Sequence, residues 1–507
     1  MKHAIPTLVL LATLRAAALP ADARAAAPAV ERPKLGNGLQ LVLSTQASVP
    51  IVAISCLVDG GARLDPPGKE GLAELTGGLL SEGTKGRSSQ DISKIVDSLG
   101  AHFSTGASQD WVEVGATVLA RDFETGVDLV ARSLREPTFP PEEFTRAKAE
   151  TLGSIESSED EPQAVAGRAF RKALFGSAPY GTPVDGSLDS VKKLSREDVL
   201  AYHASLDPSK TLCAIVGDVE TARMKEVAGR LLGAWQPQAK SLPQPRPAEA
   251  PPARKVIVDR PVAQASIVLG QIGVPRTDPD WFPIVVMNHV LGGGGFTSRL
   301  MKRIRTQGGL AYGVSSAFGA TRLPGPFQVV LQTKVASAGE AASIVREELQ
   351  RLHDEGATEE ELAAAKDYLT GNFPMKLDST AKIAGMLAQM QYFGLGDDYI
   401  DRYAERVRAV TLDDVRRASK AHLHPDALVQ VVVGPKAELE KQGFGSDATR
   451  SDDGKSAGAT PVPAPSKAAP APSTPSGKSP VAPSDGPALE PAAAPRPASG
   501  APASPGA

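Results

Sequence analysis

The hydrophobic residues of the first half of the chain follow two periodic patterns, one with the period of a strand and one with the period of a helix. Residues 103–119 end in a strict alternation of apolar and polar side chains, which is typical of an antiparallel strand. Residues 88–100 place apolar side chains on one helical face, begin with a capping box of Ser88 and Asp91, and end at a glycine, which predicts a helix. The same patterns predict strands over 52–58 and 212–216, a hairpin turn at 37–38, and helices over 71–80, 123–134, 142–157, 163–175 and 196–204.

The order of these patterns recurs in the second half. The segment EEFTRAK at 142–148 recurs as EELAAAK at 360–366, and AIVG at 214–217 recurs as VVVG at 431–434, with an offset near 217. A repeat of this length indicates one supersecondary unit used twice. We therefore predict that each half of the chain is a copy of the same α/β unit.

Composition marks the boundaries of these two units. Residues 236–254 are rich in Pro, Gln and Ala and predict an extended linker between a domain at 28–235 and a second at 255–440. Residues 445–507 contain no aromatic side chain and are rich in Pro, Ala and Ser. Because such a segment buries too little apolar surface to offset the entropy of ordering, we predict a disordered tail.

The N-terminus has the pattern of an export signal. Lys2 and His3 precede an apolar run over 4–14, and small residues follow. This predicts a cleaved signal peptide over 1–25, because eleven residues are too few to span a bilayer as a helix. We expect an exported protein, most simply in a bacterial periplasm, without a transmembrane segment. The net charge of -3 gives no indication of nucleic-acid binding.

The chain has only two cysteines, Cys56 and Cys213, and each lies in an apolar, strand-like run. Two buried free thiols are the default interpretation. A disulfide is the alternative if the two strands are neighbours in an oxidising compartment. The pairing stays open at this point, but two cysteines are too few for a cysteine metal site.

A glycine-rich stretch at 291–314, LGGGGFTSRLMKRIRTQGGLAYGV, is the most informative part of the chain. Its pattern predicts a helix that starts at 297–298 and ends at Gly308, and then a strand to residue 318. Arg305 would close the helix and Tyr312 would open the strand, so the two side chains could converge. On spacing alone, a solvated arginine and a packed tyrosine are the default interpretation. A phosphate loop is excluded, because no Gly-Lys-Ser/Thr follows the glycines.

This stretch resembles the C-terminal half of insulinase and pitrilysin-like zinc peptidases, including the processing-peptidase branch. That family carries a glycine-rich loop, then Ser-Arg-Leu, then an Arg and a Tyr seven residues apart around Gly-Leu-x-Tyr. The corresponding residues here are 298–300, Arg305 and 309–312. The resemblance covers about residues 33–440. It implies an α+β, clamshell-like fold of two homologous repeats, each a mixed, mainly antiparallel sheet with helices packed on one face.

The family's zinc motif, HxxEH, is missing from the first half. The family frame begins with Gly-Leu-Ala, which is present at 71–73. In that frame the first histidine position is Glu74, the general base is Gly77, the second histidine is Gly78, and the third ligand is Ser154. None of the seven histidines of the chain forms an HxxEH or HExxH pair. We therefore expect this chain to bind no metal or other cofactor itself.

The resemblance is to the subunit of heterodimeric family members that lacks HxxEH. By this resemblance, Arg305 would donate a hydrogen bond to a substrate carbonyl, and Tyr312 would stabilise the oxyanion that forms during hydrolysis. The predicted function is a non-catalytic, activity-enabling subunit of a periplasmic zinc metalloendopeptidase, inactive alone, with zinc and HxxEH in a sister subunit and peptides as substrates. A silent peptide-binding or scaffolding protein is the alternative, and a peptidase with displaced ligands is a third. Homodimer and heterodimer both stay open.

Overall fold

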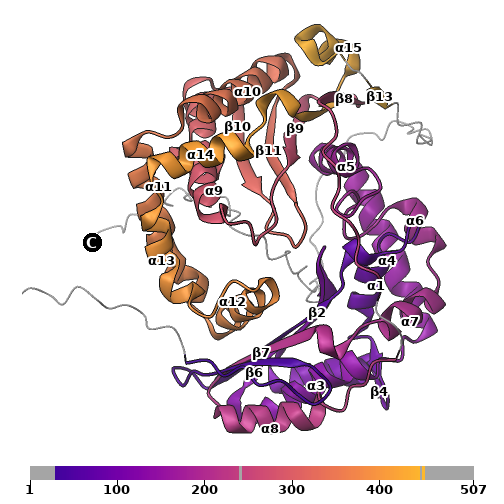
Figure 1. Cartoon of the computed structure of the whole chain (residues 1–507). Helices are drawn as coiled ribbons and strands as arrows, with labels where there is room; N and C mark the ends of the chain where they lie inside the picture. Colours follow the sequence, from indigo (N-terminus) through magenta and orange to yellow (C-terminus); the bar gives the residue numbers. More distant parts are fainter. Residues whose placement is uncertain (1–28, 239–241, 446–447, 451–507) are drawn as a thin grey trace, which may run out of the picture.

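The computed structural model describes residues 29–238, 242–445 and 448–450. The predicted signal peptide and almost all of the predicted tail lie outside these residues. Two sheets organise the chain, one in each half, and helices surround them (Figure 1). Among the described residues, no helix has both the length and the apolar character that a membrane span requires.

The sheet of the first half is mixed and mainly antiparallel. Its strands lie in the order β1-β7-β2-β6-β5. Only β1 and β7 pair in parallel, and the other neighbours are antiparallel. The strands are β1 (Gln40–Thr45), β2 (Ile51–Asp59), β5 (His102–Ala107), β6 (Trp111–Leu119) and β7 (Thr211–Gly217), and a separate short pair is β3 (Gly83–Thr84) with β4 (Arg87–Ser88).

The sheet of the second half repeats this topology. Its order is β10-β11-β9-β12-β8-β13, so β8, β12, β9, β11 and β10 take the places of β1, β7, β2, β6 and β5. The pairing of β8 with β12 is again parallel. This confirms the predicted pair of homologous repeats. The strands are β8 (Arg254–Asp259), β9 (Gln264–Ile272), β10 (Ala311–Phe318), β11 (Pro326–Lys334), β12 (Val429–Gly434) and β13 (Ala448–Arg450).

The helices that the apolar periodicity predicts for the first half are present in the structure. The predicted capping box of Ser88 and Asp91 opens α2, and matching boxes at Ser195 and Thr411 open α7 and α14 at equivalent places of the two halves. The helices of the first half are α1 (Leu72–Leu79), α2 (Ser89–Leu99), α3 (Phe123–Arg135), α4 (Pro141–Glu159), α5 (Pro162–Phe175), α6 (Leu188–Lys193), α7 (Arg196–Ala204) and α8 (Thr221–Leu231). Those of the second are α9 (Trp281–Asn288), α10 (Ala338–Glu355), α11 (Glu359–Asn372), α12 (Thr380–Phe393), α13 (Tyr399–Ala409), α14 (Leu412–His422) and α15 (Lys436–Leu439).

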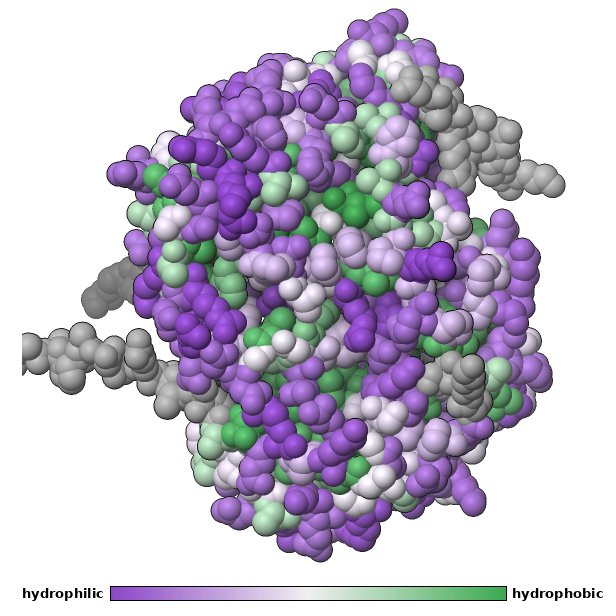
Figure 2. Space-filling model, in the orientation of Figure 1, coloured by the Kyte–Doolittle hydropathy of each residue, from purple (hydrophilic) through white to green (hydrophobic). Residues whose placement is uncertain are grey.

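The two halves exchange one helix each. Helix α5 of the first half packs on β9 and β12, and α12 of the second half packs on β2 and β7 (Figure 1). The fit is close, since a Cβ on Gly270 of β9 would lie 2.8 Å from the ring of Phe170 on α5. Each sheet therefore carries helices of its own half on one face and a helix of the other half on the opposite face. Hydrophobic residues accordingly show between hydrophilic ones where the halves meet (Figure 2).

A buried polar cluster also joins the halves. Arg63, 4% exposed, forms ion pairs with Asp59 and, at 3.2 Å, with Asp110. From the second half, the hydroxyl of Tyr392 donates to Asp59 at 3.0 Å, and the main-chain N–H of Arg322 donates to Asp110 at 2.9 Å. Buried charges are tolerated where they are paired and hydrogen-bonded. The exchanged helices and this cluster make the clamshell one packed body.

Cys56 and Cys213 form a disulfide, which corrects the default interpretation of two free thiols. The two residues are direct partners in the antiparallel pairing of β2 with β7, and their Cα atoms are 4.0 Å apart. The local sequence does not reveal this, because it does not show that β7 inserts between β1 and β2 in the sheet.

Candidate functional site

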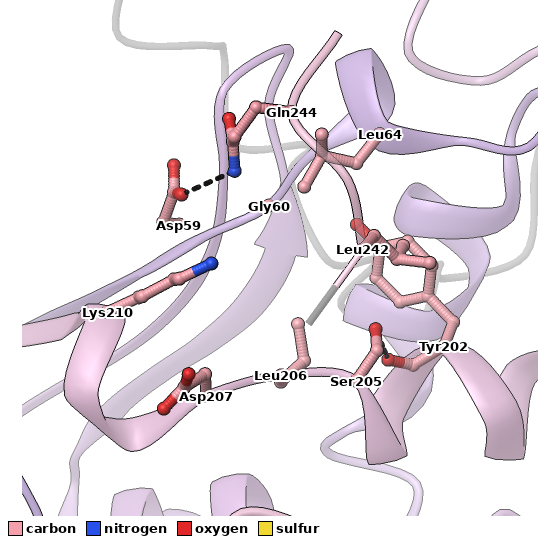
Figure 3. Close-up of a pocket in the computed structure, with 10 residues that line it drawn as sticks. All are labelled: Asp59, Gly60, Leu64, Tyr202, Ser205, Leu206, Asp207, Lys210, Leu242 and Gln244. Carbon is pink, nitrogen blue, oxygen red and sulfur yellow. Dashed lines mark hydrogen bonds between the residues drawn. The ribbon is translucent and has the colours of Figure 1, made fainter. Parts of the chain in front are cut away.

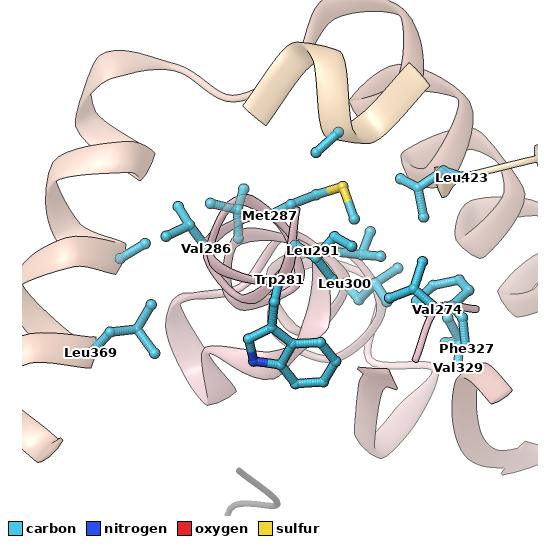
Figure 4. Close-up of a cluster of buried hydrophobic side chains, with 14 of the residues drawn as sticks. Val274, Trp281, Val286, Met287, Leu291, Leu300, Phe327, Val329, Leu369 and Leu423 are labelled. Atoms are coloured by element: carbon cyan, nitrogen blue, oxygen red, sulfur yellow. The ribbon is translucent and has the colours of Figure 1, made fainter. Parts of the chain in front are cut away.

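Buried residues fix both ends of the glycine-rich stretch. Leu291 and Leu300 are both fully buried and lie in the hydrophobic cluster that also holds Trp281 and Phe327 (Figure 4). Leu291 lies in a π-helical turn at His289–Gly293, and a 3-10 turn at Gly295–Thr297 follows before Leu300. The loop therefore starts and ends in rigid core.

The glycines of this loop are packed rather than free. A Cβ would lie 2.6 Å from the hydroxyl oxygen of Ser316 if built on Gly292, 2.7 Å from the side-chain nitrogen of Asn288 if built on Gly293, and 2.6 Å from a carbonyl oxygen if built on Gly294. For Gly292 and Gly294 backbone atoms are among those closer than 3 Å, so a side chain there would force the backbone to shift. Glycine is thus required here for close approach of the backbone, and the loop has a defined shape.

The helix that follows differs from the predicted one. Residues Met301–Gln307 form a π-helix, in which the N–H of Gly308 donates to the carbonyl of Arg303 at 3.0 Å. It ends at the predicted glycines, and Gly309 has a positive φ of 59°. Short π-helical segments are rare and are often found at functional sites. The residue pattern does not separate a π-turn from an α-turn, because both place Ile304 in the core.

The strand that follows carries a β-bulge at the predicted tyrosine. Ala311 pairs with Thr333, but Val314 pairs with Leu331, so two residues of β10 face one residue of β11. The two are Tyr312 and Gly313. A bulge of this kind changes the direction of a side chain. Tyr312 is 83% exposed, and β10 is an edge strand of its sheet.

The structure brings Arg305 and Tyr312 together, and it adds Phe296. The guanidinium carbon of Arg305 lies 4.7 Å from the centre of the Tyr312 ring and 4.7 Å from the centre of the Phe296 ring. The arginine therefore makes cation–π contacts with both rings. We call these three residues the aromatic cage. Phe296 is not among the residues predicted from the sequence, although it lies directly after the glycine run.

The arginine of the cage has free donors. Among the described residues, the side chain of Arg305 has no hydrogen-bond or ion-pair partner, unlike Arg299 and Arg303, which pair with Glu361 and Glu348. The N–H groups of a guanidinium lie in its plane and point outward at its edges. The contacts with the two rings are cation–π contacts, which use none of these N–H groups, so the donors are open to a ligand.

In the first half, backbone fills the space between α1 and β5, the edge strand equivalent to β10. The Glu74 carboxylate accepts a hydrogen bond of 3.0 Å from the N–H of Ala107 on β5, and burial raises the pKa of Glu74. A Cβ on Gly77 would lie 2.5 Å from the carbonyl of Gly106. Gly78, one residue further, is exposed and has no atom within 4 Å of its Cβ position. Ser154 is exposed on α4.

A buried carboxyl supports the start of α1. The N–H groups of Gly71 and Ala73 each donate to Asp65 at 2.8 Å. Burial raises the pKa of Asp65 to about 8, although these two hydrogen bonds act in the opposite direction. Asp65 therefore caps the helix that carries Glu74 and Gly77.

One cluster among the described residues has the composition of a metal site, and it lies elsewhere. Possible ligand atoms of Asp278, Asp280 and His422 lie within 4.8 Å of one another. Arg417 donates to both oxygens of Asp280, at 2.6 and 2.7 Å. Burial acts to raise the pKa of Asp280, but hydrogen bonds from Arg417 and His422 lower it. The carboxylate is thus neutralised by its own arginine, and the cluster is an ion-pair network between α9 and α14.

A small cavity lies at the end of β2, lined in part by Asp59, Tyr202, Lys210, Leu242 and Gln244 (Figure 3). The amide of Gln244 donates to Asp59 at 3.1 Å across it. Its water-accessible volume is about 10 Å³, which is room for about one water molecule. A peptide does not fit there.

Two family models match consecutive parts of the chain. Insulinase (peptidase family M16) matches residues 41–187, and the peptidase M16 inactive domain matches residues 193–369. The chain belongs to the insulinase (M16) family. This confirms the resemblance drawn from the glycine-rich stretch.

Similar M16 proteins carry contrasting names. The chain is 27% identical to an uncharacterized zinc protease of Streptomyces coelicolor, over 77% of this chain and 86% of that protein. It is 22% identical to the non-peptidase homolog YmxG of Helicobacter pylori, over 76% of this chain and 90% of that protein. A solved M16 inactive domain from Pseudomonas fluorescens has a TM-score of 0.76 at 28% identity, covering 80% of this chain and 98% of that chain.

The residues at the M16 metal positions do not fit zinc. A zinc site needs three or four nitrogen, sulfur or carboxylate ligands around one point. Of Glu74, Gly77, Gly78 and Ser154, only Glu74 offers a carboxylate, and Ala107 already donates to it. The backbone of Gly106 occupies the space that a side chain at Gly77 would need.

Proposed function

We propose that this protein is a non-catalytic, activity-enabling subunit of a zinc metalloendopeptidase of the M16 type. It supplies Arg305 and Tyr312 to a sister subunit that carries HxxEH. The observation that carries the proposal is the aromatic cage, which presents an arginine with free donors beside a tyrosine that is 83% exposed. A residue held in this way is directed at a ligand outside the chain.

The cage supplies charge stabilisation in this account, and the partner supplies the hydrolytic centre. Arg305 donates to the carbonyl of the bound peptide, and Tyr312 donates to the oxygen on which negative charge develops. Donors that are already in place before the reaction lower the barrier without reorganisation, and one such donor is worth about 3 kcal/mol. The fixed glycine loop and the bulge on β10 provide this preorganisation.

We place this pair outside the cytoplasm. The disulfide between Cys56 and Cys213 is compatible with an oxidising compartment, and the N-terminal pattern at 1–25 predicts export. In bacteria the periplasm meets both conditions.

A silent peptide-binding protein of the same fold is the second candidate. One observation favours it: an exposed aromatic cage with free donors can hold a peptide without any hydrolysis. The first candidate differs from it by requiring a zinc-bearing partner.

The test combines metal analysis with mixing. Purified alone, the protein should contain no stoichiometric zinc and cleave no unfolded peptide. Mixed with an HxxEH protein of the same organism, it should give zinc-dependent hydrolysis that neither protein shows alone. One zinc per chain with activity in the single protein would contradict the proposal. Peptide binding without hydrolysis, with every HxxEH protein of that organism, would favour the second candidate.

A further inference from the structure

Two buried arginines occupy equivalent positions in the two halves. Arg63 lies four residues after the end of β2, and Arg276 lies four residues after the end of β9. The residue that directly follows each strand donates its N–H to an equivalent carbonyl, that of Asp110 at 3.1 Å in the first half and that of Gly325 at 2.7 Å in the second. The exposed fractions are 4% for Arg63 and 9% for Arg276. The repeat therefore places one buried guanidinium after the second strand of each half.

The two positions differ in the charges around them. Arg63 forms ion pairs with Asp59 and Asp110. By strand register, Ile272 takes the position of Asp59 in the second half. Gly325, the residue before β11, takes the position of Asp110. The arginine of the second half therefore lacks both counter-charges, and a buried charge without a partner costs free energy.

Aromatic rings and one hydroxyl contact Arg276 instead. Its guanidinium carbon lies 4.4 Å from the centre of the Trp281 ring and 5.3 Å from the centre of the Tyr399 ring. Its Nη2 donates to the hydroxyl oxygen of Tyr399 at 2.7 Å. Among the residues that the structure describes, the side chain of Arg276 forms no ion pair, and its other guanidinium nitrogens have no acceptor but reach solvent. Burial lowers the pKa of Arg276, and the groups that act in the opposite direction are Tyr399 and Tyr403, not carboxylates.

A second cation lies close to this arginine. Lys376 belongs to a 3-10 turn that packs on α13, where the ring of Phe373 stacks on Tyr403 at 3.8 Å. Tyr399 is on the same helix. Burial lowers the pKa of the half-buried Lys376, and the positive charge of Arg276 lowers it further. In the described part of the chain no carboxylate pairs with this lysine. An anion that contacts both cations would relieve their repulsion.

We propose that Arg276, Lys376 and the hydroxyl of Tyr399 form a binding site for a carboxylate. The bound carboxylate takes the place that aspartate side chains take beside Arg63 in the first half. Its two oxygens accept from the free guanidinium nitrogens of Arg276 and from Lys376. The Tyr399 hydroxyl is a further donor, because its oxygen accepts from Arg276 while its proton has no acceptor among the described residues.

Two sources of a carboxylate fit this chemistry: the C-terminus of a peptide and a small free carboxylate. Arg276 is only 9% exposed, so a carboxylate at the end of a chain reaches it more readily than one that projects from the middle of a folded surface. The inference does not rest on the proposed function, since it needs neither zinc nor a partner subunit.

The first arm of the test measures peptide binding to the full chain by isothermal titration calorimetry. The probes are two N-acetylated Ala/Ser peptides of one sequence, one with a free C-terminal carboxylate and one amidated. If the peptide terminus is the ligand, the wild type should bind the free acid about tenfold more tightly than the amide. Lys376→Gln and Tyr399→Phe should each lower this ratio by about threefold or more, through weaker binding of the acid alone.

The second arm compares acetate with acetamide, at constant ionic strength, in thermal unfolding of the wild type. If a small free carboxylate is the ligand, acetate should raise the unfolding midpoint and acetamide should not, while the two peptides bind alike. Lys376→Gln should remove the effect of acetate.

Lys382→Gln is the matched control, because it removes a positive charge on the following helix, α12, that Asp378 already neutralises. It should change neither the peptide ratio nor the effect of acetate. Lys376→Arg, which keeps the charge, should retain most of both effects. Thermal unfolding without ligand identifies any variant that has lost its fold.

Three results would overturn the inference. One is a wild type that shows neither a preference for the acid peptide nor an effect of acetate. Another is an unchanged effect in Lys376→Gln. The third is a larger rise of the unfolding midpoint with inorganic phosphate than with acetate, which would contradict the assignment to a carboxylate.

Discussion

The two halves of the molecule share one topology but differ in what lies beside their equivalent edge strands. β5 and β10 are the equivalent edge strands of the two sheets. In the first half, the backbone of β5 lies against Gly77, and Glu74 accepts a hydrogen bond from Ala107. In the second half, a bulge in β10 directs Tyr312 outward beside Arg305. One half thus has a tightly packed contact beside its edge strand, and the other has an exposed tyrosine beside an arginine with free donors.

The largest expected effect concerns the disulfide, which belongs only to the first half. Replacing Cys56 and Cys213 by alanine should lower the free energy of unfolding by about 5 kcal/mol, because the bond joins residues 157 positions apart. Denaturant titration of the oxidised wild type and the double variant measures this. Equal stability would show that the bond does not stabilise the first half. Free thiols found by alkylation of the unfolded, unreduced protein would contradict its presence.

The two adjacent glycines of α1 should respond in opposite directions. Gly77→Ala should destabilise the protein by about 1–3 kcal/mol, because its Cβ would overlap the carbonyl of Gly106. Gly78→Ala, in open space one residue further, should stabilise by about 0.5–1 kcal/mol, since alanine is the better helix former. Chemical denaturation of both variants gives the two signs. If both variants were stabilised, the space between α1 and β5 would be open, and the contrast with the second half would fail.

A pH dependence is expected at the start of α1, the helix that carries Gly77. The folded-state pKa of Asp65 is about 8, above its ordinary value of 3.8. Between about pH 4 and pH 8, the folded protein therefore holds a proton on Asp65 that the unfolded chain has already released. The contribution of Asp65 to stability should be full below pH 4 and fall as pH rises to 8, by at most about 1.4 kcal/mol per pH unit.

The variant Asp65→Asn isolates this contribution. The difference in unfolding free energy between wild type and Asp65→Asn, measured by urea titration from pH 4.5 to 8, should decrease with pH. An increase with pH would mean that the N–H groups of Gly71 and Ala73 keep the carboxylate ionised in the folded protein.

Much of this fold could be predicted from the sequence because each repeat carries strong local signals. The capping box at Ser88 and the alternation along β6 are local properties, and both appear in the structure where they were expected. The convergence of Arg305 and Tyr312 followed from a helix, two glycines and a strand in succession.

What could not be predicted depends on contacts between distant segments. The disulfide requires β7 to lie beside β2, and the packed contact between α1 and β5 requires Gly106 to lie on Gly77. The exchange of α5 and α12 between the halves is of the same kind. The bulge at Tyr312 depends on the register with β11, and this register made the tyrosine exposed instead of packed.

The most direct test of the central claim is turnover by the mixed pair when this chain carries Arg305→Ala or Tyr312→Phe. With an unaltered HxxEH partner at saturating concentration, each variant should lower kcat about a hundredfold, which corresponds to about 2.7 kcal/mol, while the pair stays assembled and the partner keeps its zinc. Unchanged kcat in both variants would contradict the proposal that this chain assists catalysis across the subunit boundary.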